Sequence, residues 1–212
     1  MYHTLGKDAM AALDRRRAER LSRLLSLILR HRPEAFGISL DPHGWAPVEA
    51  LLEAVRRQRG WEDATAADLE AVVQLPGRRR FELRDGRMRA LYGHSVPVQP
   101  EGAPQRPPEW LYHGTAPERV AVILSEGLRP GARRFVHLSL TPLQAREVGL
   151  RHSPQPVVLT VLARRAHEAG VAFYRASGDV YLVDAVPPQF LLPPEGRPRE
   201  PVTPEPARSA PP

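Results

Sequence analysis

The 212-residue chain has no cysteine and carries 30 Lys or Arg residues against 24 Asp or Glu, a formal net charge of +6. The missing cysteines exclude disulfides, thiolate–metal sites and cysteine nucleophiles. No apolar run approaches the ~20 residues of a membrane-spanning helix, so we expect a soluble, cytoplasmic protein. Lys7 is the only lysine. The many arginines suit bidentate phosphate contacts, although arginine-rich coding would give the same bias.

The first predicted helix covers residues ~19–31. Leu21, Leu25 and Ile28 follow helical spacing, and Pro33 ends the pattern. Arg30 and His31 therefore lie at the C-terminal end of this helix, where cations are favoured by the helix dipole. Taken alone, the pair is equally well interpreted as a helix cap.

Two more helices and a hairpin follow. Apolar spacing predicts one helix over 48–55 and another over 65–73, which opens on a Thr65-to-Asp68 capping box. Asp85-Gly86 supplies the turn between strands at 80–83 and 88–92, with Arg80 on the face opposite Phe81. Three helices followed by a hairpin is the layout of a winged helix.

The second half of the chain alternates between strands and helices. A proline-rich linker between Pro97 and Pro108 precedes it. The tail from Pro187 to Pro212 holds ten prolines and is expected to be disordered beyond about Leu192. Between them the pattern predicts mostly short strands and two helices, which makes the whole chain α+β. The expected elements are strands ending at 111–112, at 136–138, 156–162, 172–174 and 180–183, and helices at 117–126 and from 141.

Three short motifs in this half carry candidate chemistry. Tyr112-His113-Gly114-Thr115 is interpreted as a strand-to-helix turn with Thr115 as N-cap, where free amides would face a pyrophosphate. His137 lies in mid-strand, and Arg151-His152 follow the end of a helix. Each has a structural alternative: a plain turn, a core histidine and a helix C-cap.

Their order resembles one family, the KptA-like RNA 2′-phosphotransferases, over roughly residues 20–192. The resemblance rests mainly on the stretches LSRLLSLILRHRPEAFGISLDPHGW, RRRFELRDGRMRALYGHS and RRFVHLS, with LYHGT and AREVGLRHSPQPVVL in addition. Ser153 and the stretch 176–179 depart from the family pattern. The resemblance implies an N-terminal winged-helix lobe for RNA and a C-terminal ADP-ribosyltransferase-like lobe for NAD. The expected divisions are 1–18 (extension), 19–95 (winged helix), 96–109 (linker), 110–192 (NAD lobe) and 193–212 (tail).

The resemblance also implies the site. The catalytic tetrad carries over to Arg30, His31, Arg80 and Arg133, with Arg134 open as an alternative for the last. The expected NAD-facing residues are His113, Gly114, Thr115, His137, Ser139, Arg151 and His152. NAD is consumed as co-substrate, no metal is expected because arginines supply the positive charge, and the protein is expected to act as a monomer on 2′-phosphorylated RNA of the tRNA splice-junction type.

The implied reaction has two steps. The RNA 2′-phosphate attacks the NAD ribose carbon that carries nicotinamide, and the neighbouring 2″-hydroxyl then attacks phosphorus and releases 2′-hydroxyl RNA with ADP-ribose 1″,2″-cyclic phosphate. Two other functions stay open at this point. One is an ADP-ribosyltransferase that modifies phosphorylated nucleic-acid ends and stops after the first step, and the other is a winged-helix nucleic-acid-binding regulator.

Overall fold

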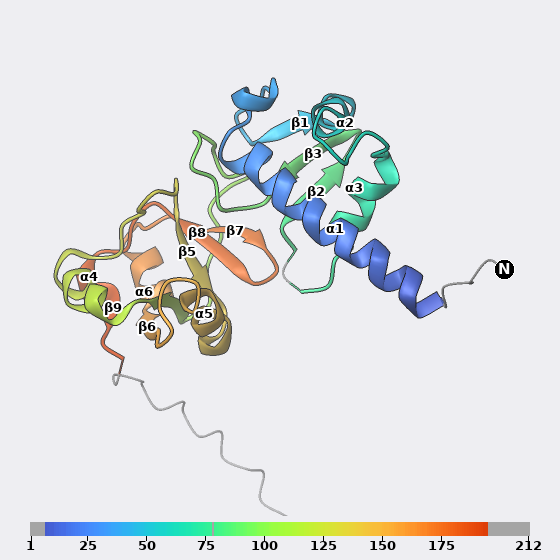
Figure 1. The fold of residues 1–212 in the computed structure, drawn as a ribbon. Coiled ribbons are helices and arrows are strands. Elements are labelled where there is room, and N and C mark those ends of the chain that lie inside the picture. Colours follow the sequence, from blue (N-terminus) through green and yellow to red (C-terminus); the bar gives the residue numbers. More distant parts are fainter. Residues whose placement is uncertain (1–6, 78, 195–212) are drawn as a thin grey trace, which may run out of the picture.

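The computed structural model describes residues 7–77 and 79–194, with side chains from residue 15 onwards. Two sheets, both with antiparallel strand pairs, lie in two lobes that are joined by one connecting segment (Figure 1). Each lobe has its own hydrophobic core. The predicted α+β class is confirmed. Residues 1–6 of the expected extension and residues 195–212 of the expected tail lie outside the described residues.

The N-terminal lobe packs three helices on a small sheet. Helices α1 (Lys7–Arg30), α2 (Val48–Arg56) and α3 (Ala66–Val73) cover strands β1 (Trp45–Pro47), β2 (Phe81–Arg84) and β3 (Arg87–Ala90), in the order β1-β3-β2. The buried leucines and isoleucine of α1 have 0% exposed area, as the helical spacing predicts. Helix α1 starts well before the expected residue 19, and the three-residue strand β1 was not predicted.

Local signals in this lobe are confirmed. The capping box between Thr65 and Asp68 is formed, and Asp85 (φ 51°) and Gly86 (φ 68°) make the tight turn between β2 and β3. Arg17 joins α1 to Asp68 of α3 (2.7 Å) and to Asp63 just before α3 (2.9 Å). These pairs hold the middle of α1, whereas core packing holds its C-terminal half, which bears the first candidate residues.

The C-terminal lobe is built on a six-stranded sheet in the order β7-β8-β5-β4-β6-β9. Its central strand β4 pairs with β5 on one side and β6 on the other, and α5 packs against β4 and β6. Three-residue 3-10 helices flank the regular elements. The bounds are β4 (Leu111–Thr115), α4 (Val120–Glu126), β5 (Val136–Ser139), α5 (Pro142–Gly149), β6 (Val157–Val161), α6 (Ala163–Glu168), β7 (Tyr174–Ser177), β8 (Val180–Val183) and β9 (Leu191–Leu192), with 3-10 helices η2 (Pro117–Arg119) and η3 (Pro188–Phe190). A further 3-10 helix, η1 (Glu34–Phe36), lies in the N-terminal lobe after α1.

Two expectations for this lobe were wrong. Thr115 is no helix N-cap: it is the last, buried residue of β4 and pairs with Val157, because the pairing of β4 with β6 runs the whole length of both strands. The strand expected at 172–174 instead covers Tyr174–Ser177, since Phe173 turns fully into the core before the pairing with β8 begins. The helix expected at 117–126 divides into η2 and α4.

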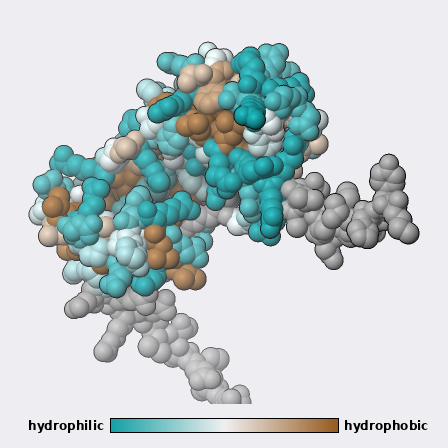
Figure 2. Space-filling model, in the orientation of Figure 1, coloured by the Kyte–Doolittle hydropathy of each residue, from teal (hydrophilic) through white to brown (hydrophobic). Residues whose placement is uncertain are grey.

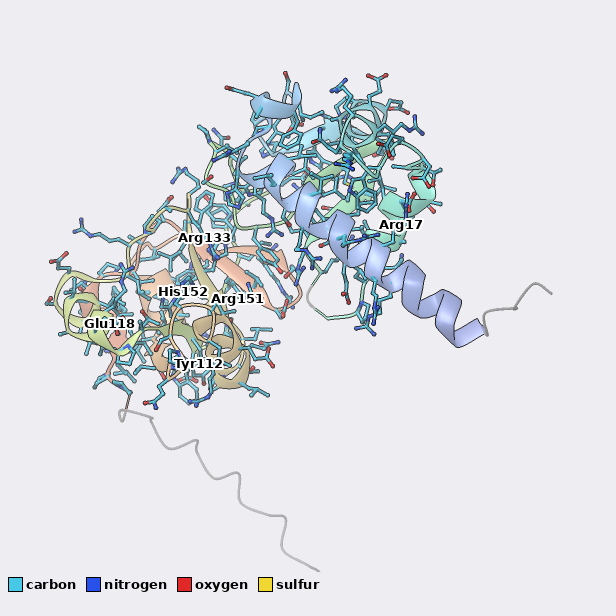
Figure 3. All side chains as sticks on the ribbon, viewed as in Figure 1. Arg17, Tyr112, Glu118, Arg133, Arg151 and His152 are labelled. Atoms are coloured by element: carbon cyan, nitrogen blue, oxygen red, sulfur yellow. The ribbon has the colours of Figure 1, made fainter. Side chains whose placement is uncertain are left out.

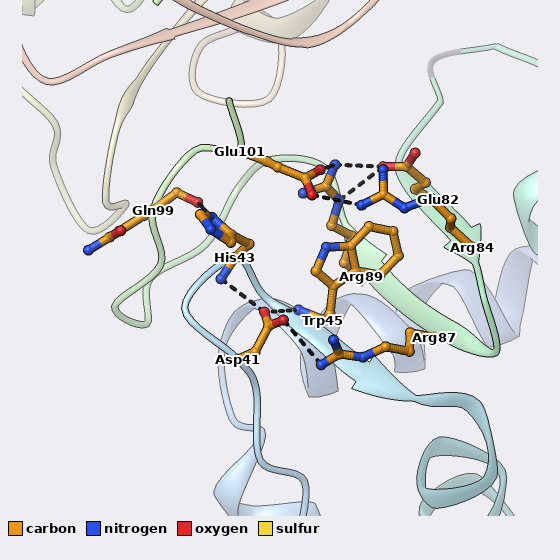
Figure 4. Close-up of polar contacts among 9 residues, drawn as sticks. All are labelled: Asp41, His43, Trp45, Glu82, Arg84, Arg87, Arg89, Gln99 and Glu101. Carbon is orange, nitrogen blue, oxygen red and sulfur yellow. Dashed lines mark hydrogen bonds and ion pairs between the residues drawn. The ribbon is translucent and has the colours of Figure 1, made fainter. Parts of the chain in front are cut away.

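The segment that connects the two lobes contacts both of them. Glu101 forms ion pairs with Arg84 (2.7 Å) and Arg89 (2.6 Å) of the N-terminal sheet, and the Gln99 carbonyl lies 3.3 Å from His43 Nδ1 (Figure 4). Val98 is buried in a small third hydrophobic cluster, together with Phe135 and with Val180 and Leu182 of β8. These contacts tie the first half of the predicted linker to both lobes, which fixes how the two lobes face each other.

Candidate active site between the lobes

One cleft between the lobes is lined by fourteen residues drawn from both. Of the eleven site residues expected from the sequence, nine lie on its walls, and their roles remain a prediction. They are Arg30, His31 and Arg80 from the N-terminal lobe and His113, Gly114, Arg133, His137, Ser139 and Arg151 from the C-terminal lobe. Thr115 and His152 do not line it: the first is buried in the sheet, and the second is exposed beside it.

The end of α1 presents Arg30 and His31 to the cleft. Pro33 has no amide hydrogen to donate to the Leu29 carbonyl, so the helix does not continue through it. The carbonyl of Arg30, the last residue of α1, accepts from the Ser95 amide (2.9 Å) and from the Ser95 hydroxyl (3.3 Å). The segment after β3 therefore caps α1 and holds its last turn against the cleft.

The same serine contacts His31. Its hydroxyl oxygen lies 3.0 Å from His31 Nδ1. Because that hydroxyl donates to the Arg30 carbonyl, it can accept a hydrogen bond from an Nδ1–H, which leaves the lone pair on Nε2. Burial and the nearby Arg30 and Arg133 lower the pKa of His31. A free enzyme near neutral pH thus holds His31 neutral and able to take up a proton.

Two aromatic rings flank the guanidinium of Arg30. Its guanidinium lies 5.4 Å from the Phe81 ring centroid and 5.3 Å from that of Tyr92, and its Nη2 donates to the Arg80 carbonyl (3.4 Å). Gly93 has φ 91°, and a Cβ there would come within 3.3 Å of Arg30 Nη1, so a larger residue would crowd the guanidinium. Burial, together with Arg80, Arg133 and Arg151, lowers the pKa of Arg30 to about 10, although Tyr92 opposes this.

The two neighbouring arginines before β5 point to different places. Arg133 is half-buried in the cleft, near Arg151, and burial lowers its pKa (Figure 3). Arg134 is exposed, pairs with Asp184 (3.1 Å) and lies over the Phe135 ring. Among the described residues, no carboxylate pairs with Arg30, Arg80, Arg133 or Arg151. The cleft is therefore a concentration of unneutralised guanidinium groups, which an anion with several oxygens would stabilise.

The opposite wall is made of histidines on adjacent strands. His113 Nδ1 lies 3.1 Å from the His137 carbonyl, and His137 Nε2 is buried without a hydrogen-bond partner. Burial, aided by Arg133, lowers the pKa of His137 to about 3, and burial also lowers that of His113. Both rings are neutral near pH 7. A buried polar atom without a partner on the wall of a cleft indicates a position where a polar group of a ligand could form a hydrogen bond.

Gly114 has a packing reason that the sequence did not reveal. A Cβ on Gly114 would meet the Ala145 carbonyl of α5, and one on Gly149 would come within 3.3 Å of Gly114 Cα. The two glycines let α5 lie directly on β4, which brings Arg151, just after α5, to the cleft. Gly114 lines the cleft, but a glycine is needed at this position because the backbone of α5 packs closely against it.

Sequence reasoning also left out Tyr92, Gly93 and Ser95. Tyr92 contacts both lobes, since its ring lies over Arg30 and meets the His137 ring edge-on at 6.0 Å. All three lie in the irregular stretch after β3, within the quoted motif but without a periodic pattern. Among the described residues, no group of three or more His, Asp or Glu is arranged as metal ligands would be. Within the same residues, no helix has the length and apolar character of a membrane crossing.

Comparison with known proteins shows the family of the chain. A family model described as "RNA 2'-phosphotransferase, Tpt1 / KptA family" matches residues 16–185. Proteins named probable RNA 2′-phosphotransferase are similar along most of their length. Those of Burkholderia lata, Streptomyces griseus and Bacillus thuringiensis are 45%, 43% and 40% identical over 177, 189 and 174 residues, which cover 82%, 85% and 81% of this chain and 90%, 98% and 92% of theirs. The chain belongs to the RNA 2′-phosphotransferase, Tpt1/KptA family, whose activity is the NAD-dependent removal of a 2′-phosphate from RNA.

Proposed function

We propose that the interlobe cleft removes an internal 2′-phosphate from RNA in two steps, with NAD as the second substrate. The observation that carries this assignment is the set of cleft arginines without a carboxylate partner around His31. Guanidinium groups hold a phosphate dianion through paired hydrogen bonds and stabilise the charge on its oxygens during transfer. A carboxylate would compete with the phosphate, and the described cleft contains none.

In the first step, the 2′-phosphate oxygen forms a bond to the NAD ribose carbon as the bond to nicotinamide breaks. Arg30 and Arg80 hold the phosphate, because both come from the N-terminal wall and Arg30 is fixed by its two aromatic rings. NAD lies against the neutral wall, where His137 Nε2 is free to bind a polar group of the ribose or amide. Neutral imidazoles there avoid repulsion of the cationic pyridinium ring.

In the second step, the 2″-hydroxyl of the transferred ribose attacks phosphorus and the RNA 2′-oxygen leaves. His31 Nε2 accepts the hydroxyl proton and returns it to the departing oxygen. Arg133 is the fourth tetrad member, since it lines the cleft whereas Arg134 pairs with Asp184 outside it. The products are 2′-hydroxyl RNA and ADP-ribose 1″,2″-cyclic phosphate, so atoms and charge balance without water or a metal ion.

We also propose the identities of the lobes. Residues 19–95 form the RNA-binding winged helix, and residues 110–192 form the ADP-ribosyltransferase-like NAD lobe. The separate cores and sheets of the two halves support this division. The RNA is of the tRNA splice-junction type, and the enzyme acts as a cytoplasmic monomer.

The test is to incubate the protein with NAD and a short RNA that carries one internal 2′-phosphate, and to identify the products by mass spectrometry. The same RNA without the 2′-phosphate is the control. ADP-ribose cyclic phosphate and nicotinamide are expected in equal amounts. Release of inorganic phosphate would refute the assignment. RNA that stays ADP-ribosylated would favour a transferase that stops after the first step, and RNA binding without NAD consumption would favour a regulator.

A further inference from the structure

A second concave surface lies in the N-terminal lobe, next to the cleft. Arg15, Glu19 and Arg23 of α1 form one side of it, and Arg79 and Arg80 form the other. The floor is apolar and comes from the end of α3 and the segment after it, including Val72, Leu75 and Pro76. We call this surface the α1 groove. On the face drawn in Figure 2, the region over α1 is largely hydrophilic.

The α1 groove carries four arginines against one glutamate. Glu19 pairs with Arg15 (3.2 Å), and both side chains are exposed, so the pair restricts Arg15 only weakly. Within the described part of the chain, Arg23 and Arg79 have no carboxylate partner. A row of arginines, of which Arg23 and Arg79 have no carboxylate partner among the described residues, therefore lies above an apolar floor. Such a surface matches a polyanion whose sugars and bases are less polar than its backbone.

Arg80 makes the groove continuous with the cleft, because it lines both. Its Nη1 lies 3.4 Å from the hydroxyl of Ser22, which is only 1% exposed and is fixed on α1. The guanidinium thus stands at the boundary between the two surfaces. An anion held by Arg80 in the cleft would have the α1 groove as its nearest basic neighbour.

The position of the α1 groove beside the cleft, together with the proposed function, indicates which ligand the groove binds. A nucleotide with an internal 2′-phosphate continues as RNA on both sides. The C-terminal wall of the cleft is assigned to NAD, so the strand must leave over the N-terminal lobe. We propose that the α1 groove binds the backbone phosphates of single-stranded RNA that flanks the 2′-phosphorylated nucleotide, with Arg23 and Arg79 as its main contacts. The inference rests on the proposed function.

The test compares two substrates and two charge-matched variants. Arg23→Glu/Arg79→Glu changes the groove, and Arg129→Glu/Arg165→Glu makes the same change at exposed positions of the C-terminal lobe. The substrates are a dinucleotide with an internal 2′-phosphate and a twelve-nucleotide RNA with one at its centre. For the groove variant we expect KM for the long RNA to rise about tenfold, with kcat unchanged and KM for the dinucleotide within about twofold. The control variant keeps both KM values within that same factor.

A binding measurement separates this inference from the proposed function. The affinity of a fluorescent twelve-nucleotide RNA without 2′-phosphate is followed by anisotropy against salt concentration. Loss of two phosphate contacts should reduce the slope of log Kd against log salt by about 1.4 in the groove variant. Wild-type binding and KM in that variant, or an equal loss on both substrates, would overturn the α1 groove as an RNA path. An inactive wild type with a normal slope change would instead refute only the proposed function.

Discussion

The two walls of the cleft differ in charge and in construction. The N-terminal wall presents Arg30 and Arg80 from a helix end and a loop, close to the exposed His31. The C-terminal wall presents His113 and His137 from strands whose backbones are fixed by sheet pairing, and their lowered pKa values keep both rings neutral. One wall is suited to hold a dianion, and the other to hold an uncharged or cationic group without repulsion.

Two arginines of the C-terminal lobe, Arg133 and Arg151, are the exceptions that make the comparison useful. Arg133 comes from just before β5, yet its charge joins that of the opposite wall, since it lowers the pKa of both Arg30 and His31. The proposed phosphate site is therefore complete only when the two lobes face each other as the connecting segment holds them. Substitutions in either lobe test this division of the site, and their expected effects differ in size.

The largest effect is expected from the adjacent arginines before β5. Arg133→Ala should lower kcat for 2′-phosphate removal about 100-fold or more, because one guanidinium is lost from the transition state. Arg134→Ala is the matched control: it removes the exposed pair with Asp184 and the contact with the Phe135 ring, both outside the cleft, and should stay within about threefold of wild type. Steady-state kinetics of both variants give the comparison. Equal losses would show that the cleft does not distinguish the two positions.

A smaller but clear loss is expected when the charge is kept and the shape is changed. Arg80→Lys should reduce kcat/KM by roughly 10- to 100-fold, because a point charge cannot make the paired contacts of a guanidinium. The folded state should be retained, since Arg80 is exposed and, among the described residues, its side chain forms a hydrogen bond only with Ser22. Thermal unfolding checks the fold. Wild-type turnover would contradict direct phosphate contact by Arg80.

A substitution of Ser95 tests whether the N-terminal wall fixes the tautomer of His31. Ser95→Ala removes the hydroxyl beside His31 Nδ1 while the backbone amide bond to the Arg30 carbonyl remains. We expect kcat to fall about tenfold as His31 loses its fixed tautomer, with KM little changed. Ser95→Thr keeps the hydroxyl and should recover most of the rate. A purely structural role would predict no such recovery, and ¹⁵N chemical shifts of the His31 ring would then be unchanged.

The smallest effect is a displaced pH profile. The lowered pKa of His31 means that the neutral, proton-accepting form is present above that pKa and is lost as pH falls through it. The acid limb of kcat/KM, which reports the free enzyme, should therefore lie below the ordinary histidine value of about 6.5. The acid limb of kcat should lie higher, because bound phosphate dianion raises the pKa again. Coincident limbs would contradict the pairing of His31 with the phosphate.

Local signals in the sequence predicted much of the fold. The apolar face of α1, the Thr65 capping box and the Asp85-Gly86 turn are each fixed within a few residues, and all three are found in the structure. What failed depends on distant partners. Thr115 follows a glycine and precedes Ala-Pro as an N-cap would, but its pairing with Val157 decides its conformation. Strands β1 and β9 have only three and two residues, too few for a pattern.

The candidate site divides in the same way. Residues within recognisable motifs, such as Arg30, Arg80 and His137, could be chosen from the sequence, and the structure brings them to one cleft. The sequence favours Arg133 over Arg134 only for its spacing to His137, and Arg134 stays open there as an alternative. The feature that separates the two side chains is the pair of Arg134 with Asp184, fifty residues further along the chain. Ser95 escaped notice for a similar reason: its partner His31 is 64 residues away.

The most direct test of a cleft that joins a phosphate wall to a NAD wall is a single-turnover reaction of His31→Ala with RNA labelled at its 2′-phosphate. The account predicts that the first step continues while the second slows by about 100-fold or more, so that ADP-ribosylated RNA accumulates before any cyclic phosphate appears. Wild-type formation of the cyclic phosphate, with no accumulated intermediate, would contradict it.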